Sequence, residues 1–177
     1  MSFIILDVES DGPVPHLYSM VCFGAVVVES SGLSKKFYGK TKPISEKWDP
    51  EALAISGFSR EQHEAFDDPK EVMEKFENWL KLNSKGRPVF VSDNNGFDWS
   101  FINYYFHAFL GRNPFGHSSR RLGDLYCGLK KDASVNSEWK KLYRKTTHNH
   151  DPVQDALGNA EALLSFKKEL GLKIGLN

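Results

Sequence analysis

Residues 2–9 read Ser-Phe-Ile-Ile-Leu-Asp-Val-Glu, an apolar run that becomes acidic at its end. Such a run is typical of a buried β-strand. Side chains alternate between the two faces of a strand, so Asp7 and Glu9 would point to the same side. Two buried carboxylates repel each other unless protons, hydrogen bonds or a cation offset their charge, and oxygen ligands of this kind suit Mg²⁺ or Mn²⁺. The segment therefore predicts a central strand with a candidate metal site at its end.

The rest of the chain predicts further strands first and most helices later. We expect strands at residues 20–29, about 34–41 and 88–92, and helices from Asp68 to about Leu82, from about Phe97 to Leu110, and from Asp151 to about Leu170. Asp68-Pro69 and Asp151-Pro152 are typical helix starts, because Asp caps free backbone N–H groups and proline suits the first helical position. This order favours an α/β fold with a mixed central β-sheet flanked by α-helices. Residues 111–116 and 130–150 are the expected long connections.

Length and composition predict a single domain over residues 1–177. A chain of 177 residues with 40% hydrophobic content can form one substantial core and is short for two. It contains no apolar stretch near the roughly 20 residues of a membrane span, and no secretory signal is recognisable, so we expect no membrane association and a cytoplasmic location. Cys22 and Cys127 are then expected to be free thiols without a chemical role.

The charges are balanced overall but unevenly distributed along the chain. Both the basic and the acidic residues number 23, while residues 1–100 hold 16 acidic and 11 basic side chains and residues 101–177 hold 7 and 12. Between Arg120 and Lys145, eight basic residues face three acidic ones. This segment could bind phosphates, or it could simply be a solvated helical face.

Two further motifs carry candidate catalytic residues. Asn94-Asn95-Gly96-Phe97-Asp98 lies between a short strand and a helix, where Asp98 could face inward or merely cap the helix. His150 precedes the helix that opens at Asp151-Pro152, and Asp155 follows in that helix, so a loop histidine could act beside a rigidly held carboxylate. A lone histidine is more often a surface residue, and we expect this of His148. None of the three motifs is specific alone, since Asp-x-Glu arises by chance in roughly half of chains this long.

Together and in this order, the three motifs resemble those of the DEDDh 3′–5′ exonuclease superfamily, which includes enzymes of the RNase T and oligoribonuclease type. The match comprises Asp7 and Glu9, then Asn94, Phe97 and Asp98, then His150 and Asp155, and it covers nearly the whole chain. The segments Phe97–Trp99, Asn113–His117 and Arg120–Asp124 are similar to the small exoribonucleases of the ribonuclease AS type, which trim adenylated RNA. Asp93 departs from the pattern, because many relatives have histidine before the motif asparagine.

This resemblance implies a ribonuclease H-like fold and hydrolysis at the 3′ end of a single strand, most readily RNA, with release of nucleoside 5′-monophosphates. The four carboxylates of Asp7, Glu9, Asp98 and Asp155 would hold two Mg²⁺ ions, with Mn²⁺ as a substitute. His150 would be the general base, since histidine titrates near neutral pH.

The resemblance also suggests how the substrate is held. The expected substrate-binding residues are Ser10, Leu17, Met20, Asn94, Phe97, Arg120 and Arg121. Leu17 and Met20 would lie against the terminal base, and the basic segment 120–145 would guide the strand. Many relatives form dimers in which basic residues of one subunit serve the other's site, so a homodimer is expected.

Two other functions are compatible with the same residues. The metal chemistry is indifferent to the sugar, so a DNA 3′–5′ exonuclease of repair or proofreading type is one alternative. A non-catalytic nucleic-acid-binding module on the same fold is another, although all five expected side chains are present. A structural protein whose acids only cap helices would leave the order of the motifs unexplained.

Overall fold

A five-stranded mixed β-sheet forms the centre of the computed structural model, which describes residues 1–176. The strands are β1 (Ser2–Ser10), β2 (Met20–Val28), β3 (Lys36–Lys40), β4 (Pro88–Ser92) and β5 (Ser119–Arg121). They lie in the order β3-β2-β1-β4-β5. β1 is antiparallel to β2 and parallel to β4, β2 is antiparallel to β3, and β4 is parallel to β5. The mixed central sheet expected from the sequence is confirmed.

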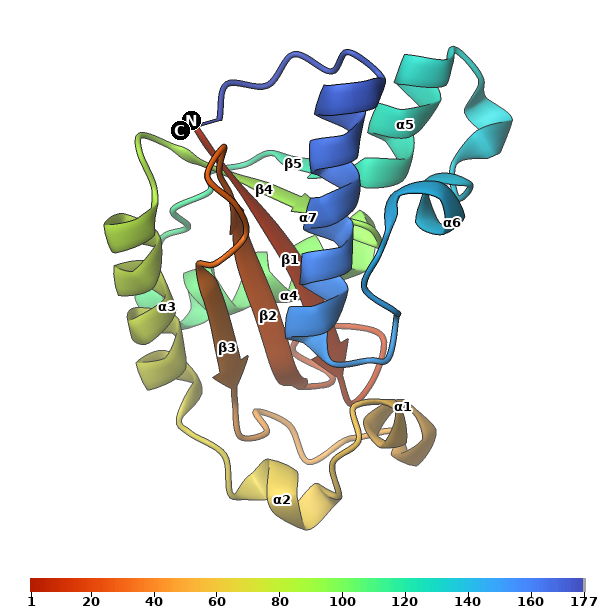
Figure 1. The fold of residues 1–177 in the computed structure, drawn as a ribbon. Helices are drawn as coiled ribbons and strands as arrows, with labels where there is room; N and C mark the ends of the chain where they lie inside the picture. Colours follow the sequence, from red (N-terminus) through yellow and green to blue (C-terminus); the bar gives the residue numbers. More distant parts are fainter. Residues whose placement is uncertain (177) are drawn as a thin grey trace.

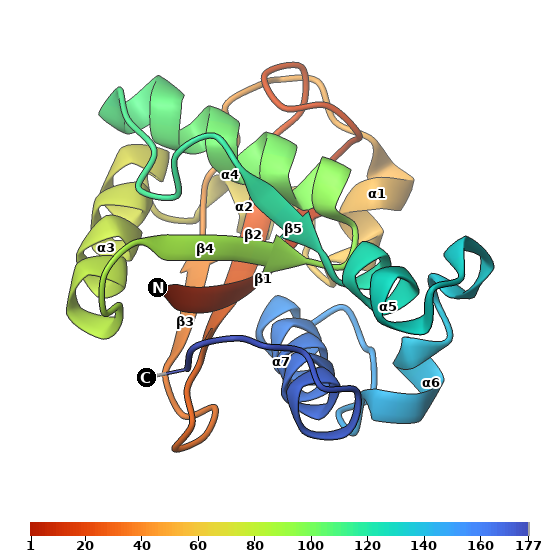
Figure 2. The same ribbon diagram turned by 90° about the horizontal axis from the view of Figure 1, so that it is seen from above.

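Helices cover both faces of this sheet (Figure 1). The longer ones are α3 (Pro69–Asn83), α4 (Asn95–Leu110) and α7 (Pro152–Glu169). Seen from above, α3 and α4 lie on one side of the sheet and α7 lies on the other (Figure 2). All three correspond to helices that the sequence predicts. Within residues 1–176, no helix is both long and apolar enough to cross a membrane.

The core has one layer on each face of the sheet, because the side chains of β1 alternate. Leu6 packs with Phe76 of α3 and Phe106 of α4 in one layer. Ile5 packs with Phe166 of α7 in the other. By the same alternation, the acidic side chains that end β1 lie on the face covered by α7.

A glycine on β2 lets the start of α7 approach the sheet closely. Gly24 is the partner of Asp7 across the β1–β2 pair. A Cβ on Gly24 would lie 2.3 Å from the carbonyl carbon of Pro152, the first residue of α7, so any other residue would push the helix away. This close approach brings the first turn of α7, which carries Asp155, next to Asp7.

Several short elements were not predicted from the sequence. Besides β5, they are α1 (Pro50–Ile55), α2 (Arg60–Glu64), α5 (Leu122–Lys130), the 3₁₀ turn η1 (Ala133–Val135) and α6 (Trp139–Tyr143). Helices of five or six residues span less than two turns, too few for a hydrophobic period to be recognised. α5 is longer, but it has no side-chain cap and contains two glycines, both of which weaken the helix signal. The segment 130–150, expected to be a connection, thus contains η1 and α6.

Candidate active site

Four carboxylates from three separate elements meet at the carboxyl end of β1. Asp7 and Glu9 lie on β1, Asp98 lies in the first turn of α4, and Asp155 lies in the first turn of α7. An oxygen atom of each of Asp7, Glu9 and Asp155 lies within 4.8 Å of the other two. The backbone N–H of Val8 donates to Oδ1 of Asp98 at 3.2 Å, which ties α4 to the same strand. The four acids singled out in the sequence therefore form one cluster.

Asp98 does not act as a helix cap. The N-cap of α4 is Asn94, three residues before Phe97, and the Asp98 side chain is turned toward β1 instead. Asp98 is only 2% exposed, a burial that the capping alternative does not require. The inward-facing orientation, which the sequence left open, is the observed one.

The pKa values of three acids in the cluster are raised because these acids are buried close together. Burial, followed by the charges of Asp98 and Glu9, raises the pKa of Asp7 well above its usual value. Burial also raises the pKa of Asp98. For Glu9, burial and the nearby charge of Asp155 raise the pKa to about 7. Without a cation, the ionised forms of these groups destabilise one another.

A divalent cation would fit this set of donors. Oδ2 of Asp98 is buried and has no hydrogen-bond partner among the described residues, which is costly for a carboxylate oxygen. Clustered carboxylate oxygens are the ligands that Mg²⁺ and Mn²⁺ prefer. The residues present therefore fit a divalent cation.

The loop before α7 brings two histidines to the cluster. Nδ1 of His150 lies 3.4 Å from Oε1 of Glu9, and the backbone N–H of His150 donates to Oδ2 of Asp155 at 3.0 Å. His150 has a φ of 60°, a left-handed conformation that this backbone hydrogen bond helps to hold. His148, expected to be only a surface residue, places Nδ1 2.7 Å from Oδ2 of Asp155. The sequence therefore identified one of the two histidines at the site and missed the other.

A buried arginine, also missed as a site residue, neutralises part of the cluster. Nη2 of Arg144 donates to Oδ1 of Asp155 at 2.8 Å, and the two side chains are 8% and 1% exposed. Gly158, one turn further along α7, provides the space, since a Cβ there would lie 2.7 Å from Nε of Arg144. The guanidinium also lowers the pKa of Asp7 through its charge, against the larger effect of burial.

A cleft of about 390 Å³ is lined by Asp7, Glu9, Asp98 and both histidines, and its size suits a small ligand group. Of the expected substrate-binding residues, Asn94, Phe97 and Arg121 line this cleft. Lys140 of α6, which belongs to the basic segment 120–145, also lines it. Ile55 of α1 lines it too and was not predicted, because α1 is too short to show a hydrophobic period.

The other expected substrate-binding residues lie elsewhere. Met20 is fully buried and belongs to the core layer of α3 and α4, so the expectation that it contacts a base is corrected. Arg120 lies over the ring of Phe3 and lines a separate pocket, so its contact with the substrate remains a prediction. Ser10 is buried and donates its hydroxyl to the carbonyl oxygen of Gly12. Leu17 is 52% exposed but does not line the cleft.

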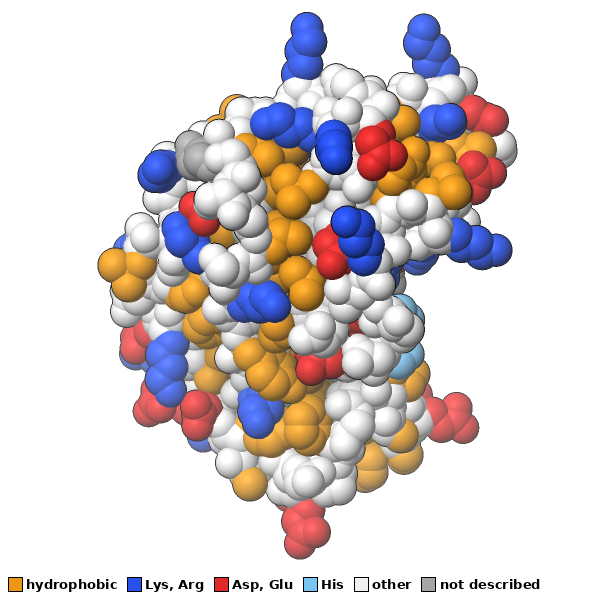
Figure 3. Space-filling view, in the orientation of Figure 1, with side chains coloured by type: hydrophobic (Ala, Val, Ile, Leu, Met, Phe, Trp, Pro, Cys, Tyr) orange, Lys and Arg blue, Asp and Glu red, His pale blue; other side chains and the backbone are white. Residues whose placement is uncertain are grey.

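The basic segment 120–145 does not form a single exposed face. Arg144 points inward to Asp155, whereas Lys140 pairs with Asp93 at the edge of the cleft. Arg121 donates from Nε to the carbonyl oxygen of Asp93 at 3.1 Å. The space-filling view shows histidine side chains in a hollow at the right edge of the molecule, with Lys and Arg side chains gathered above it (Figure 3).

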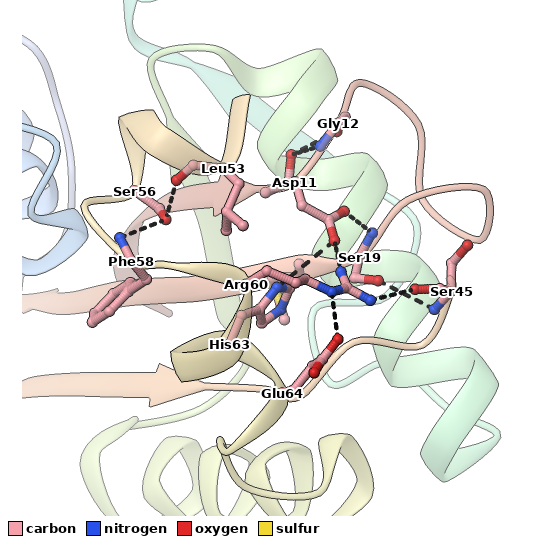
Figure 4. Close-up of polar contacts among 12 residues, drawn as sticks. Asp11, Gly12, Ser19, Ser45, Leu53, Ser56, Phe58, Arg60, His63 and Glu64 are labelled. Atoms are coloured by element: carbon pink, nitrogen blue, oxygen red, sulfur yellow. Dashed lines mark hydrogen bonds and ion pairs between the residues drawn. The ribbon is translucent and has the colours of Figure 1, made fainter. Parts of the chain in front are cut away.

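A buried polar network lies between the β1–β2 connection, α1 and α2 (Figure 4), and α1 contributes Ile55 to the cleft. The carboxylate of Asp11 is fully buried and accepts hydrogen bonds from the backbone of Ser19 and, at 3.1 Å, from Nη1 of Arg60. Its backbone carbonyl accepts from Asp49, the N-cap of α1. His63 lies 3.7 Å from the Asp11 carboxylate, and burial lowers its pKa to about 4, so it is neutral near pH 7. The network thereby joins the β1–β2 connection to α1 and α2.

Comparison with known proteins identifies the family. A family model described as RNase T, exonuclease, matches residues 4–163. The chain is 39% identical to the 3′–5′ DNA exonuclease Cap18 of Escherichia coli over 95% of each protein. It is also 26% identical to a PolC-type DNA polymerase III of Thermotoga petrophila, over 99% of this chain and 12% of the polymerase.

Solved structures of low sequence identity share the fold. The nuclease domain of 3′hExo, a DEDDh family member bound to rAMP, superposes with a TM-score of 0.77 at 19% identity, over 98% of this chain and 96% of that one. The zinc-bound complex of E. coli ExoI with single-stranded DNA gives 0.72 at 19% identity, over 95% and 41% of the two chains. With its ribonuclease H-like sheet and its match to the family model over most of its length, the chain belongs to the RNase T family of DEDDh 3′–5′ exonucleases.

Proposed function

We propose that this exonuclease removes nucleoside 5′-monophosphates from the 3′ end of single-stranded DNA, using two divalent ions held by its carboxylate cluster. One observation carries the catalytic part of the proposal: four acids from β1, α4 and α7 come together at the carboxyl end of β1, and among the described residues a buried oxygen of Asp98 has no hydrogen-bond partner. The choice of DNA rests on the 39% identity to a relative named as a DNA exonuclease. The sequence motifs led us to expect RNA as the substrate instead, and that preference for RNA remains a prediction.

The carboxylates would hold the metal ions, with Mg²⁺ as the first choice and Mn²⁺ as a substitute. Asp7, Glu9 and Asp155 offer oxygen atoms close enough to share ions, and Asp98 is oriented toward them by the Val8 N–H. When bound, the ions supply the positive charge that phosphodiester cleavage needs at the phosphate and the leaving oxygen.

His150 would take the proton from the attacking water. Its Nδ1 faces the Glu9 carboxylate, which orients the ring and leaves the second ring nitrogen available as a base. The ring is 46% exposed, so water can reach it. Because His150 lies on a loop joined to Asp155 through its backbone N–H, the base stays beside the metal ligands.

The cleft walls would position the terminal nucleotide. Phe97 and Ile55 provide apolar surface for a base, and Arg121 and Lys140 provide positive charge for phosphates. Asn94 can hydrogen-bond to the same nucleotide. Leu17, exposed on the β1–β2 connection, is proposed to contact the strand further from the cleft.

We further propose that residues 1–177 act as one exonuclease domain that pairs into a homodimer in the cytoplasm. The dimer is supported by the resemblance to DEDDh enzymes, and the location by free Cys22 and Cys127, since a reducing compartment keeps thiols unpaired. Light scattering of the purified protein at micromolar concentration tests the dimer, and a monomeric mass would contradict it.

The test is a time course on matched 5′-labelled single-stranded DNA and RNA with Mg²⁺ or Mn²⁺. A ladder that shortens from the 3′ end, faster on DNA, supports the proposal, and it should vanish with EDTA or in Asp155→Asn. Asp67→Asn is the matched control, because the Asp67 side chain is exposed and pairs with exposed Lys75. Faster cutting of RNA would change the substrate to RNA. Absence of cutting of either strand with both metals would favour the binding-module alternative.

A further inference from the structure

His148 and His150 form, with Asp155, a second set of metal ligands beside the carboxylate cluster. We propose that these three side chains form a zinc site whose occupation blocks catalysis. His148 has no place in the DEDDh motifs, so the carboxylate chemistry gives no reason for a second imidazole here.

The geometry of the three side chains is that of a nearly assembled site. One ligand atom from each residue lies within 4.8 Å of the other two. Nδ1 of His148 is 2.7 Å from Oδ2 of Asp155, and the two imidazole rings are 4.4 Å apart between centroids. Zn²⁺ bonds of about 2.0–2.1 Å place tetrahedral ligand atoms about 3.3 Å apart, so small side-chain rotations would complete the site.

The ligand types distinguish this site from the carboxylate cluster. Two imidazoles and one carboxylate suit Zn²⁺, whereas Mg²⁺ prefers oxygen ligands. Glu9 could supply a fourth ligand through Oε1, which lies 3.4 Å from Nδ1 of His150. The imidazoles are 54% and 46% exposed while Asp155 is 1% exposed, so an ion can enter from solvent and bind a rigid carboxylate.

The loop that carries the histidines is fixed at both ends on α7. Glu161 accepts hydrogen bonds from the backbone of Lys145 and Thr146, each at 2.8 Å. At the other end, Asp151 caps α7 through the N–H groups of its first turn. Arg144 also donates to the other oxygen of Asp155, Oδ1. Residues next to a metal site commonly hydrogen-bond to the metal ligands in this way and orient them. The ligands are therefore largely preorganised.

Zinc at this site would interfere with catalysis because two of its ligands have other tasks. Asp155 would be shared with the carboxylate cluster, and His150 would no longer be available as a base. This consequence rests on the proposed function, whereas zinc binding itself does not.

Direct binding of the metal tests the site without any nuclease reaction. Calorimetric titration with Zn²⁺, and visible spectra with Co²⁺ as a stand-in, should be recorded for the wild type, His148→Gln and the control His107→Gln. His107 is exposed on α4, away from the cleft. His148→Gln should weaken Zn²⁺ binding by at least about tenfold and remove the strong absorption of tetrahedral Co²⁺, while His107→Gln keeps both.

His148→Gln leaves all four acids in place, so it separates this site from zinc bound by the carboxylates alone. Equal Zn²⁺ affinity and equal Co²⁺ spectra in the wild type and His148→Gln would overturn the proposal, whether or not the enzyme cuts nucleic acid. In the Mg²⁺-dependent cleavage assay, His148→Gln should need about tenfold more Zn²⁺ than the wild type for half inhibition. Identical Zn²⁺ inhibition of both would overturn the inhibitory role, and the ladder in the absence of Zn²⁺ reports on the proposed function separately.

Discussion

Nη2 of Arg144 lies 2.8 Å from Oδ1 of Asp155, so the acid that α7 contributes to the site is paired with a buried guanidinium. Charges removed from water are costly unless they are paired. Arg144 is the buried positive side chain that meets this cluster among the described residues, and it holds Asp155 in one orientation. The pair therefore supports the metal-binding arrangement before any ion arrives.

Arg144→Met should destabilise the metal-free protein. Removing one partner of a buried ion pair typically costs about 3–5 kcal/mol, and here it leaves a cluster of acids without its buried counter-charge. We expect the free energy of unfolding in urea with EDTA at pH 8 to fall by about 3 kcal/mol, and Mg²⁺ to restore part of it. Arg144→Lys should lose less, because it keeps the charge. Equal stability of Arg144→Met and the wild type would show that the guanidinium is not needed.

Gly158→Ala should also destabilise the protein, although alanine normally favours helices. Its Cβ would lie 2.7 Å from Nε of Arg144 and displace the guanidinium, at a cost of about 1–3 kcal/mol. Gly128→Ala in α5 is the matched control, because no atom lies within 4 Å of a Cβ there, and it should gain up to about 1 kcal/mol. In an Arg144→Ala background the cost of Gly158→Ala should disappear. If both single alanine variants gain stability, the space at Gly158 has no such role.

The metal-free protein should lose stability between about pH 4.5 and 7 through Glu9. The pKa of Glu9 is raised from 4.5 to about 7, so the folded state binds this proton more tightly than the unfolded state. The contribution is full below pH 4.5 and is lost as pH rises through 7, with a ceiling of about 3 kcal/mol. Glu9→Gln should therefore gain stability over the wild type across this window in EDTA.

Urea unfolding of both proteins at several pH values measures that difference. Comparing the two proteins removes the contributions of other titrating groups that they share. Saturating Mg²⁺ at pH 8 should reverse the order, because the ion binds ionised Glu9 and not glutamine. A difference that stays constant from pH 4.5 to 8 in EDTA would contradict the burial of Glu9 among like charges.

Arg60→Met should loosen the β1–β2 connection and α1, which contributes Ile55 to the cleft. It leaves the buried Asp11 carboxylate without its guanidinium partner, which we expect to cost about 3 kcal/mol. Backbone hydrogen exchange should increase in residues 11–19 and in α1. Lys75→Met is the control, since Lys75 and Asp67 are both exposed and their pair is worth about 0–1 kcal/mol. Unchanged exchange in Arg60→Met would mean that the network does not anchor these segments.

The main layers of the fold could be predicted because their signals are local. The apolar run before Asp7 marks the central strand, and Asp-Pro pairs mark the starts of α3 and α7. The shorter helices span too few residues to show a hydrophobic period, and β5 consists of three residues. Neither could therefore be predicted from the sequence.

The acids of the site could also be predicted, since each follows a recognisable strand or helix boundary. Contacts between distant segments could not. Asp11 and Arg60 are 49 residues apart, and no pattern near either residue signals the other. Met20 was wrongly assigned to the substrate because its position after the first motif says nothing of its burial, which follows from how β2 packs on α3 and α4.

The most direct test of the carboxylate site is the rate of 3′-end removal from 5′-labelled single-stranded DNA by Asp98→Asn with Mg²⁺. This change replaces a single oxygen of the cluster with an amide nitrogen and keeps the side-chain volume, so folding can be confirmed by the thermal transition. We expect the rate to fall by at least about a thousandfold, the scale of losing about 4 kcal/mol of transition-state stabilisation, while Asp67→Asn keeps wild-type activity. Cleavage by Asp98→Asn at the wild-type rate with the same Mg²⁺ dependence would contradict this expectation.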